Sequence, residues 1–146
     1  ERLQPIVEAL DKMVEARPAE ISENLQLDIL SDFASGALSL GERGGHIKWL
    51  SKALDARQRY LDAVDRTTDP ISWGAAQQEI GRALTALGER EGARDKLEEG
   101  ASRLRLAMDA LRSTDSLQQA EVALRALQRA EQTLQQRRRV GLRWPG

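Results

Sequence analysis

Residues 69–90 have the sequence DPISWGAAQQEIGRALTALGER, which contains the start and stop signals of a long helix. Asp69 suits the N-cap position, because its carboxylate can accept a hydrogen bond from an unpaired backbone N–H of the first turn, and Pro70 is tolerated in that turn. Apolar residues then recur at helical spacing up to Leu87, which is followed by a glycine. The stretch therefore predicts a helix over residues 70–87.

The end of this stretch also occurs earlier in the chain. The tetrapeptide Leu-Gly-Glu-Arg occupies residues 40–43 and again residues 87–90, a shift of 47 residues. Each copy is predicted to form the turn of a helical hairpin, in which Gly41 or Gly88 takes the left-handed conformation that ends the first helix. The same shift superposes Phe33 on Ile80, Leu50 on Leu97, Asp62 on Asp109, Val64 on Leu111 and Thr67 on Thr114. The repeat predicts hairpins stacked side by side, and the alternative is an irregular helical bundle in which the tetrapeptide recurs by chance.

The rest of the chain has a helical composition. Leu, Ala, Glu, Arg and Gln dominate, aromatic residues make up 3%, and no segment alternates with a period of two. We therefore expect an all-α fold, a short solenoid of antiparallel helical hairpins. About six helices are predicted, at residues 3–17, 19–40, 45–67, 70–87, 91–113 and 115–139. They form a single domain over residues 1–139, with units at about 19–67 and 70–113, partial units at 1–17 and 115–139, and a basic tail at 140–146.

The second unit resembles a known family of repeats. Residues 69–90 are followed by Lys96-Leu97-Glu98-Glu99-Gly100, and this segment is similar to bacterial tetratricopeptide repeats. Those repeats have the pattern Pro-x-x-Trp-Ala-x-x-Gln-x-x-Leu-Gly-x-Ala-Leu-x-x-Leu-Gly-Glu-Arg, followed by a Leu-Glu-Glu-Ala second helix. The spacing from Gly81 to Ala93, Leu97 and Gly100 is also kept, so that small residues would let the two helices approach closely around Leu97.

The resemblance weakens outside residues 69–101, since the first unit has Ala34 in place of Gly81 and the last helix has Gln128 there. It implies antiparallel helix pairs in which the first helix of each pair lines a concave surface that binds peptides. It also implies a module of a kind that is often appended to signalling or peptidase domains.

Composition excludes several kinds of chemistry. The chain has no cysteine and one histidine, His46, which removes thiolate metal sites, cysteine nucleophiles and any mechanism that needs two imidazoles. The glycine-rich segment 41–45 lacks the lysine and the preceding strand of a phosphate-binding loop. We therefore expect a protein that is not an enzyme and that uses no metal and no cofactor. His46 is expected to pack between helices, Trp73 to anchor packing between units, and Trp49 to be either packed or partly exposed.

The candidate site is then the concave surface. Helical spacing and the 47-residue shift place on it the side chains of Gln78, Arg82, Arg125, Arg129 and Gln132. An arginine side chain can hold a carboxylate by two parallel hydrogen bonds, so this strip predicts a protein or peptide partner that is acidic or offers a C-terminal carboxylate.

The same shift places Ser31 and Ser35 of the first unit on this surface. The alternative interpretation is a solvated helix face with ion pairs at helical spacing, such as Glu79 with Arg82 and Glu121 with Arg125.

The first function prediction is therefore a non-catalytic protein-interaction or scaffold module. The alternative is a regulatory or spacer segment of a larger signalling enzyme or peptidase. The net charge of −1 argues against nucleic acid, and only the arginines of residues 137–146 favour RNA or an acidic surface. Acidic residues in 1–30 and basic residues in 115–146 leave a head-to-tail homo-oligomer open. No apolar run is long enough to span a membrane, and the lack of cysteine fits a cytoplasmic protein.

Overall fold

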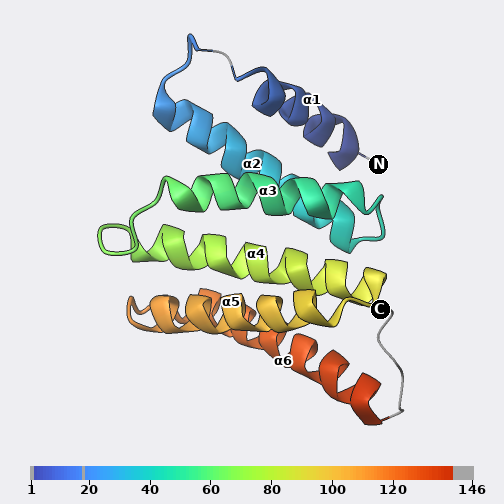
Figure 1. Ribbon diagram of the computed structural model, residues 1–146. Coiled ribbons are helices and arrows are strands. Elements are labelled where there is room, and N and C mark those ends of the chain that lie inside the picture. The colour runs from blue at the N-terminus through green and yellow to red at the C-terminus, as the bar shows by residue number, and fades with distance from the viewer. Residues whose placement is uncertain (1, 18, 140–146) are drawn as a thin grey trace.

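The computed structural model describes residues 2–17 and 19–139 and is all-α over those residues (Figure 1). This confirms the expected all-α class. The predicted basic tail, residues 140–146, lies outside the described residues. The six helices are α1 (Leu3–Ala16), α2 (Glu23–Glu42), α3 (Lys48–Asp62), α4 (Pro70–Glu91), α5 (Arg94–Arg112) and α6 (Leu117–Arg139).

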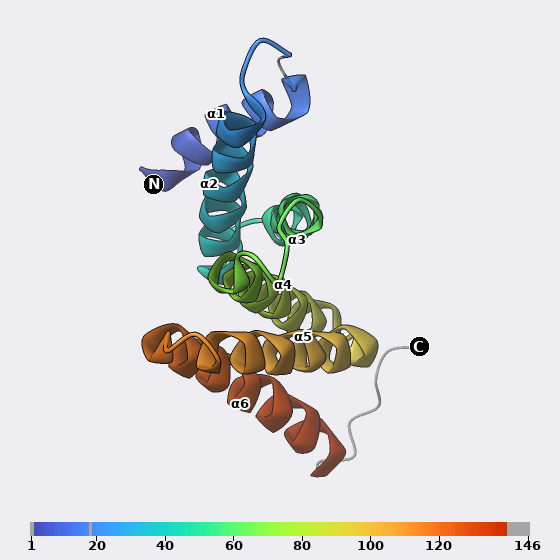
Figure 2. The same cartoon turned by 90° about the vertical axis from the view of Figure 1, so that its left-hand side faces the viewer.

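Successive helices lie side by side in chain order, from α1 at one end of the molecule to α6 at the other (Figures 1 and 2). Short connections join α2 to α3 and α4 to α5, so each pair is an antiparallel hairpin. We call α2, α4 and α6 the first helices, because α2 also contacts α4 and α4 also contacts α6. The first helices therefore form one continuous face of the stack.

The start of α4 follows the sequence prediction, while the start of α2 does not. Asp69 Oδ1 accepts a hydrogen bond from the Ser72 N–H at 3.1 Å, and Pro70 is the first residue of α4. The second helix begins at Glu23 and not at residue 19, because Ser22 is its N-cap and Ser22 Oγ accepts from the Leu25 N–H at 3.3 Å.

The role predicted for the glycine of the repeated tetrapeptide is wrong. Gly41 and Gly88 lie inside α2 and α4, and both are buried. The left-handed glycines come later: Gly44 has φ 90° in the turn after α2, and Gly92 has φ 64° as the C-cap of α4. Both first helices consequently extend past their predicted ends, to residues 42 and 91.

What Gly41 and Gly88 provide is close contact between helices. A Cβ atom on Gly88 would lie 2.7 Å from Leu97 Cγ, and one on Gly41 would lie 2.5 Å from Leu50 Cγ. These two contacts are related by the 47-residue shift. In both hairpins a leucine near the start of the second helix therefore packs onto a bare stretch of the first helix.

The glycine contact is repeated along α4. A Cβ on Gly81 would lie 2.6 Å from Leu104 Cγ and 3.0 Å from the Gly100 carbonyl oxygen. Two turns earlier on α4, a Cβ on Gly74 would lie 2.9 Å from Leu111 Cγ. Glycines at seven-residue spacing thus leave a flat strip on α4, and the leucines of α5 fill it. The close approach predicted at Gly81 and Gly100 is confirmed.

His46 does not have the packing role predicted for it, whereas Trp49 and Trp73 both pack against other helices. His46 is exposed, and its Nδ1 accepts a hydrogen bond from the Lys48 N–H at 3.0 Å, so it supports the start of α3 and does not pack between helices. Trp49 is buried in the core that α1 to α4 share. Trp73 is half-buried and packs against the cluster of Leu61, Ile80 and neighbours.

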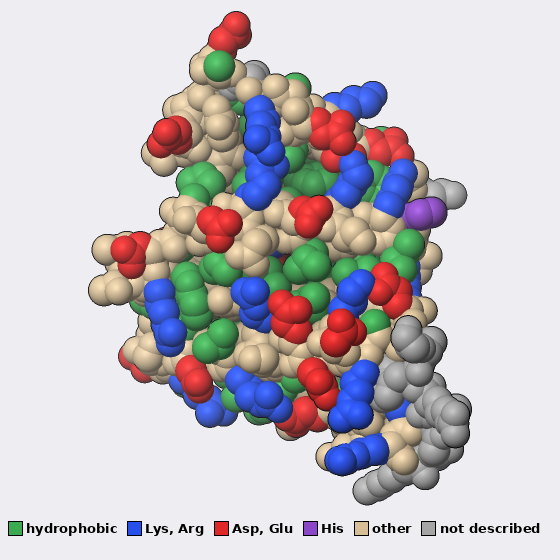
Figure 3. Space-filling model, in the orientation of Figure 1, with side chains coloured by type: hydrophobic (Ala, Val, Ile, Leu, Met, Phe, Trp, Pro, Cys, Tyr) green, Lys and Arg blue, Asp and Glu red, His purple; other side chains and the backbone are tan. Residues whose placement is uncertain are grey.

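None of the helices in residues 2–17 and 19–139 has the length and apolar character needed to cross a membrane. On the face seen in Figure 1, acidic and basic side chains are interspersed (Figure 3).

Two glycine-to-alanine substitutions test the close packing. Gly88→Ala is expected to lower the free energy of unfolding by about 1 kcal/mol, because overpacking costs about 1–3 kcal/mol and outweighs a gain in helix propensity of about 1 kcal/mol. The matched control is Gly36→Ala on α2, where a Cβ would meet only the Val7 Cγ2 methyl, at 2.8 Å. Urea denaturation should show a smaller loss or a gain for Gly36→Ala, and equal losses would contradict the packing role of Gly88.

Candidate binding groove

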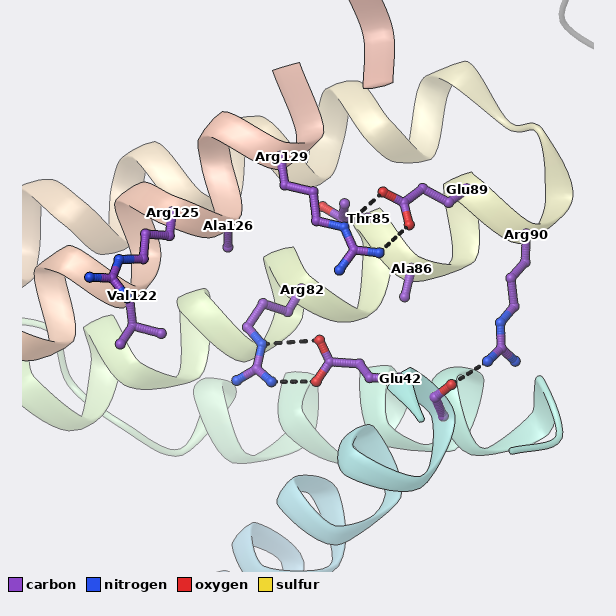
Figure 4. Close-up of a pocket in the computed structure, with 11 residues that line it drawn as sticks. Glu42, Arg82, Thr85, Ala86, Glu89, Arg90, Val122, Arg125, Ala126 and Arg129 are labelled. Carbon is purple, nitrogen blue, oxygen red and sulfur yellow. Dashed lines mark hydrogen bonds and ion pairs between the residues drawn. The ribbon is translucent and has the colours of Figure 1, made fainter. Parts of the chain in front are cut away.

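The three first helices frame a groove of about 400 Å³ (Figure 4). It lies where the end of α2 meets the second half of α4 and the middle of α6. Its lining combines apolar and charged side chains: Gly41, Glu42, Arg82, Thr85, Ala86, Glu89, Arg90, Val122, Arg125, Ala126 and Arg129.

The groove brings together three of the five predicted site residues. Arg82 on α4 and Arg125 and Arg129 on α6 all line it. Gln78 is only 8% exposed and is not among the lining residues. Gln132 is exposed, and it is also outside the lining.

Two of the arginines are held by the preceding first helix. Arg129 on α6 donates to Glu89 on α4, with Nη2 2.8 Å from Oε2 and Nε 3.2 Å from Oε1. Arg82 on α4 forms the same forked pair with Glu42 on α2, where Nε lies 3.3 Å from Oε2. The 47-residue shift superposes both members of one pair on both members of the other. The ion pair is therefore a repeated contact between neighbouring first helices.

The electrostatics of the groove extend beyond these pairs. Hydrogen bonding to Glu89 and its negative charge raise the pKa of Arg129, and the carboxylate of Glu42 adds to this increase. Thr133 Oγ1 also donates to Glu89 Oε1, at 3.2 Å. The negative charges of Glu42 and Glu89 therefore both act on Arg129.

Arg90, the last residue of the second tetrapeptide, also links neighbouring units. Its Nη1 donates to the Gly45 carbonyl at 2.7 Å, and its Nη2 donates to the Gly41 carbonyl. The Gly41 carbonyl lies in the last turn of α2, where backbone carbonyls lack partners within the helix, and the Gly45 carbonyl lies in the turn that follows α2. Arg90 therefore caps α2 from the next hairpin, and Figure 4 shows its side chain extending away from the middle of the groove.

Arg125 is the lining arginine with no partner on another helix among the described residues. Its Nη2 lies 2.7 Å from Glu121 Oε1, one turn earlier on α6. Its side chain is 75% exposed. Val122 and Ala126, on the same helix, add apolar surface beside it. The predicted Glu121–Arg125 pair is confirmed.

The predicted pair of Glu79 with Arg82 is wrong, because each residue has a partner on another helix. Arg82 pairs with Glu42, and Glu79 pairs with Arg57 on α3. Helical spacing alone favoured the local pair, while packing turned the two side chains toward different neighbours.

Arg57 on α3 is a buried arginine whose contacts join α3 to α2 and α4. The residue is 5% exposed, and its guanidinium donates to Ser31 Oγ at 3.0 Å and to Ser35 Oγ at 2.8 Å, both on α2. Ser35 Oγ in turn donates to Glu79 Oε1 on α4 at 2.9 Å. Ser31 and Ser35 therefore face this network and do not line the groove as predicted. The network fixes α2 and α4, two of the three helices that frame the groove.

The site predicted from the sequence did not include Glu42, Glu89 or Arg57. The two glutamates could have been predicted, because the 47-residue shift superposes Glu42 on Glu89 and Arg82 on Arg129. Arg57 gave no such signal, because the shift superposes it on Leu104.

Comparison of the chain with known protein families, with curated proteins and with solved structures finds no match. The resemblance to tetratricopeptide repeats therefore stays a prediction from the motif in residues 69–101. Within residues 2–17 and 19–139, no group of three or more His, Cys, Asp or Glu side chains is arranged to hold a metal ion.

Removal of Arg57 tests whether the buried network holds the groove helices together. Arg57→Ala is expected to lower the free energy of unfolding by about 3 kcal/mol, because it removes the buried guanidinium with its hydrogen bonds to α2 and leaves the half-buried Glu79 without its counter-charge. The control is Arg94→Ala, which breaks an exposed pair with Glu98 of 2.8 Å and should cost less than about 1 kcal/mol. If chemical denaturation gives the same loss in the free energy of unfolding for both variants, the buried network contributes no more to stability than an exposed ion pair.

Proposed function

We propose that this chain is a non-catalytic interaction module that binds an acidic segment of another protein in the groove between α2, α4 and α6. The observation that carries the proposal is the composition of the groove lining, which contains four arginines and two glutamates beside apolar side chains. Excess positive charge in a concave site attracts a carboxylate-rich segment and orients it.

The arginines divide into two groups with different tasks. The first group comprises Arg82, Arg90 and Arg129, which donate hydrogen bonds to the preceding first helix or to the turn that follows that helix. Breaking these contacts to bind a ligand would also loosen the stack. Among the residues that the structure describes, Arg125 pairs only with Glu121 on its own helix. An exposed ion pair one turn apart contributes about 0.3–0.5 kcal/mol. A ligand carboxylate can therefore replace Glu121 at Arg125 with little cost.

The apolar part of the lining defines a second requirement on the ligand. Val122 is 46% exposed, and Ala86 and Ala126 also line the groove. An aliphatic side chain placed there would remove this surface from water. The ligand that fits best is an acidic segment that also carries an aliphatic residue.

A matched pair of peptides tests the proposal. The probes are two fluorescein-labelled octapeptides, one that alternates Glu and Leu and one that alternates Gln and Leu, titrated with the chain in a fluorescence anisotropy experiment. The acidic probe should bind about tenfold more tightly, since a hydrogen bond to a charged group contributes about 1.5–3 kcal/mol.

Substitutions locate the binding on the groove. Arg125→Ala should weaken the acidic probe about tenfold, while Arg94→Ala, which removes an arginine from a similar exposed pair on α5, should leave its affinity unchanged. Equal affinity for the two probes, or equal effects of the two variants, would refute a groove that recognises carboxylates.

A further inference from the structure

Helix α1 has the position of a second helix whose own first helix is not in the stack. Shifts of 47 and 94 residues superpose Leu3 of α1 on Leu50 of α3 and on Leu97 of α5. The packing follows the same order, since α1 packs on α2 as α3 packs on α4 and α5 packs on α6. Lys52 further holds α1 to α3, with its Nζ 2.7 Å from Asp11 Oδ2 and 3.2 Å from Glu15 Oε1.

One side of α1 is used in this packing. Val7 is fully buried, and Leu3, Leu10 and Val14 pack against the core that includes α2. The corresponding residues of α5, Ala101, Leu104 and Met108, pack in the cluster that α5 shares with α6. This side of each second helix contacts the first helix that follows it in the chain.

The second helices α3 and α5 use another side to contact the first helix that precedes them. In α5, Leu97 and Leu104 lie against Gly88 and Gly81 of α4, and Gly100 lies against Thr85. In α3, Leu50 lies against Gly41 of α2 in the same way.

The equivalent side of α1 is apolar and partly covered: Leu3 and Leu10 are half-buried against the core that includes α2, whereas Ile6 and Met13 are exposed. We call Leu3, Ile6, Leu10 and Met13 the α1 stripe; these residues correspond to Leu97, Gly100, Leu104 and Ala107 of α5. Ile6 is 58% exposed and Met13 is 43% exposed, whereas their counterparts Gly100 and Ala107 are buried. Two large apolar side chains of α1 are therefore exposed to water at positions where α5 is covered by another helix.

We propose that the α1 stripe binds an amphipathic helix of the first-helix type, one with small residues at seven-residue spacing. The two equivalent surfaces, on α3 and α5, are each covered by such a helix, and the α1 stripe continues the same series. Ile6 stands where α5 has Gly100, so the incoming helix meets Ile6 through the residues that correspond to Gly81 and Thr85 of α4. This site is on the opposite end of the stack from α6 and is separate from the proposed groove (Figure 1).

The α6 helix of a second copy does not have the required surface. The positions of α6 that correspond to Gly74, Gly81 and Gly88 of α4 are Glu121, Gln128 and Gln135, and all three are exposed. Long polar side chains at these positions would hold α1 away and leave its leucines without a flat strip to contact. The occupant we infer is therefore a helix with glycine or alanine at these positions.

A helix of this chemistry is available as a synthetic peptide of residues 69–92, which carries the strip of Gly74, Gly81 and Gly88. Labelled with fluorescein and titrated with the chain, it should give a saturable rise in anisotropy. The same peptide with Gly81→Glu and Gly88→Glu should bind at least about tenfold more weakly, because the glutamates block the approach of Leu10 and Leu3.

Variants of the chain locate the binding. Ile6→Glu and Met13→Glu should each weaken the peptide about tenfold or more, while Leu106→Glu, at an exposed apolar position on α5, should leave it unchanged. Circular dichroism before titration confirms that each variant is folded. The proposal is overturned if the peptide does not bind, or if Leu106→Glu weakens it as much as the α1 variants do. It is also overturned if sedimentation shows that the stripe instead joins two copies in a dimer that Met13→Glu dissociates.

Discussion

The strip of glycines on α4 is the constraint on which the arrangement of the molecule depends. Gly74, Gly81 and Gly88 let Leu111, Leu104 and Leu97 pack directly on the backbone of α4. A side chain at any of these positions would force the two helices apart, since interiors are packed too densely to absorb an extra atom. The separation of α4 and α5 in turn sets where the next helix, α6, can lie. The width of the groove is thus decided by residues that do not line it.

Repeated ion pairs align the first helices along their length. The pairs Arg82–Glu42 and Arg129–Glu89 are related by the same 47-residue shift. Each of α4 and α6 is therefore held to the preceding first helix at the corresponding position along its length. The same pairs neutralise much of the charge in the groove. What is left for a ligand is mainly the exposed Arg125 beside Val122 and Ala126. One set of arginines therefore builds the site, and a different arginine is suited to recognition.

Prediction from sequence succeeded where the signal was local or periodic and failed where it depended on a distant partner. The cap at Asp69, the all-α class and the close approach of Gly81 to Gly100 all follow from spacing along one or two helices. Helical spacing also suggested that Glu79 pairs with Arg82. In the folded chain Glu79 lies next to the buried Arg57, a residue from another helix that gave no pattern in the sequence.

The repeated tetrapeptide shows most clearly what each level contributes. By itself the sequence determined that residues 40–43 and 87–90 do the same task in two similar hairpins, because a repeat of 47 residues imposes the same local packing twice. Only the tertiary structure decided what that task is. A leucine of the second helix packs on the glycine, and the glutamate accepts hydrogen bonds from an arginine of the next first helix. The reason is physical. Helix propensity and capping act over a few neighbouring residues, whereas the partners of these side chains lie 9 residues away in one case and 40 in the other, and only the folded stack brings them into contact.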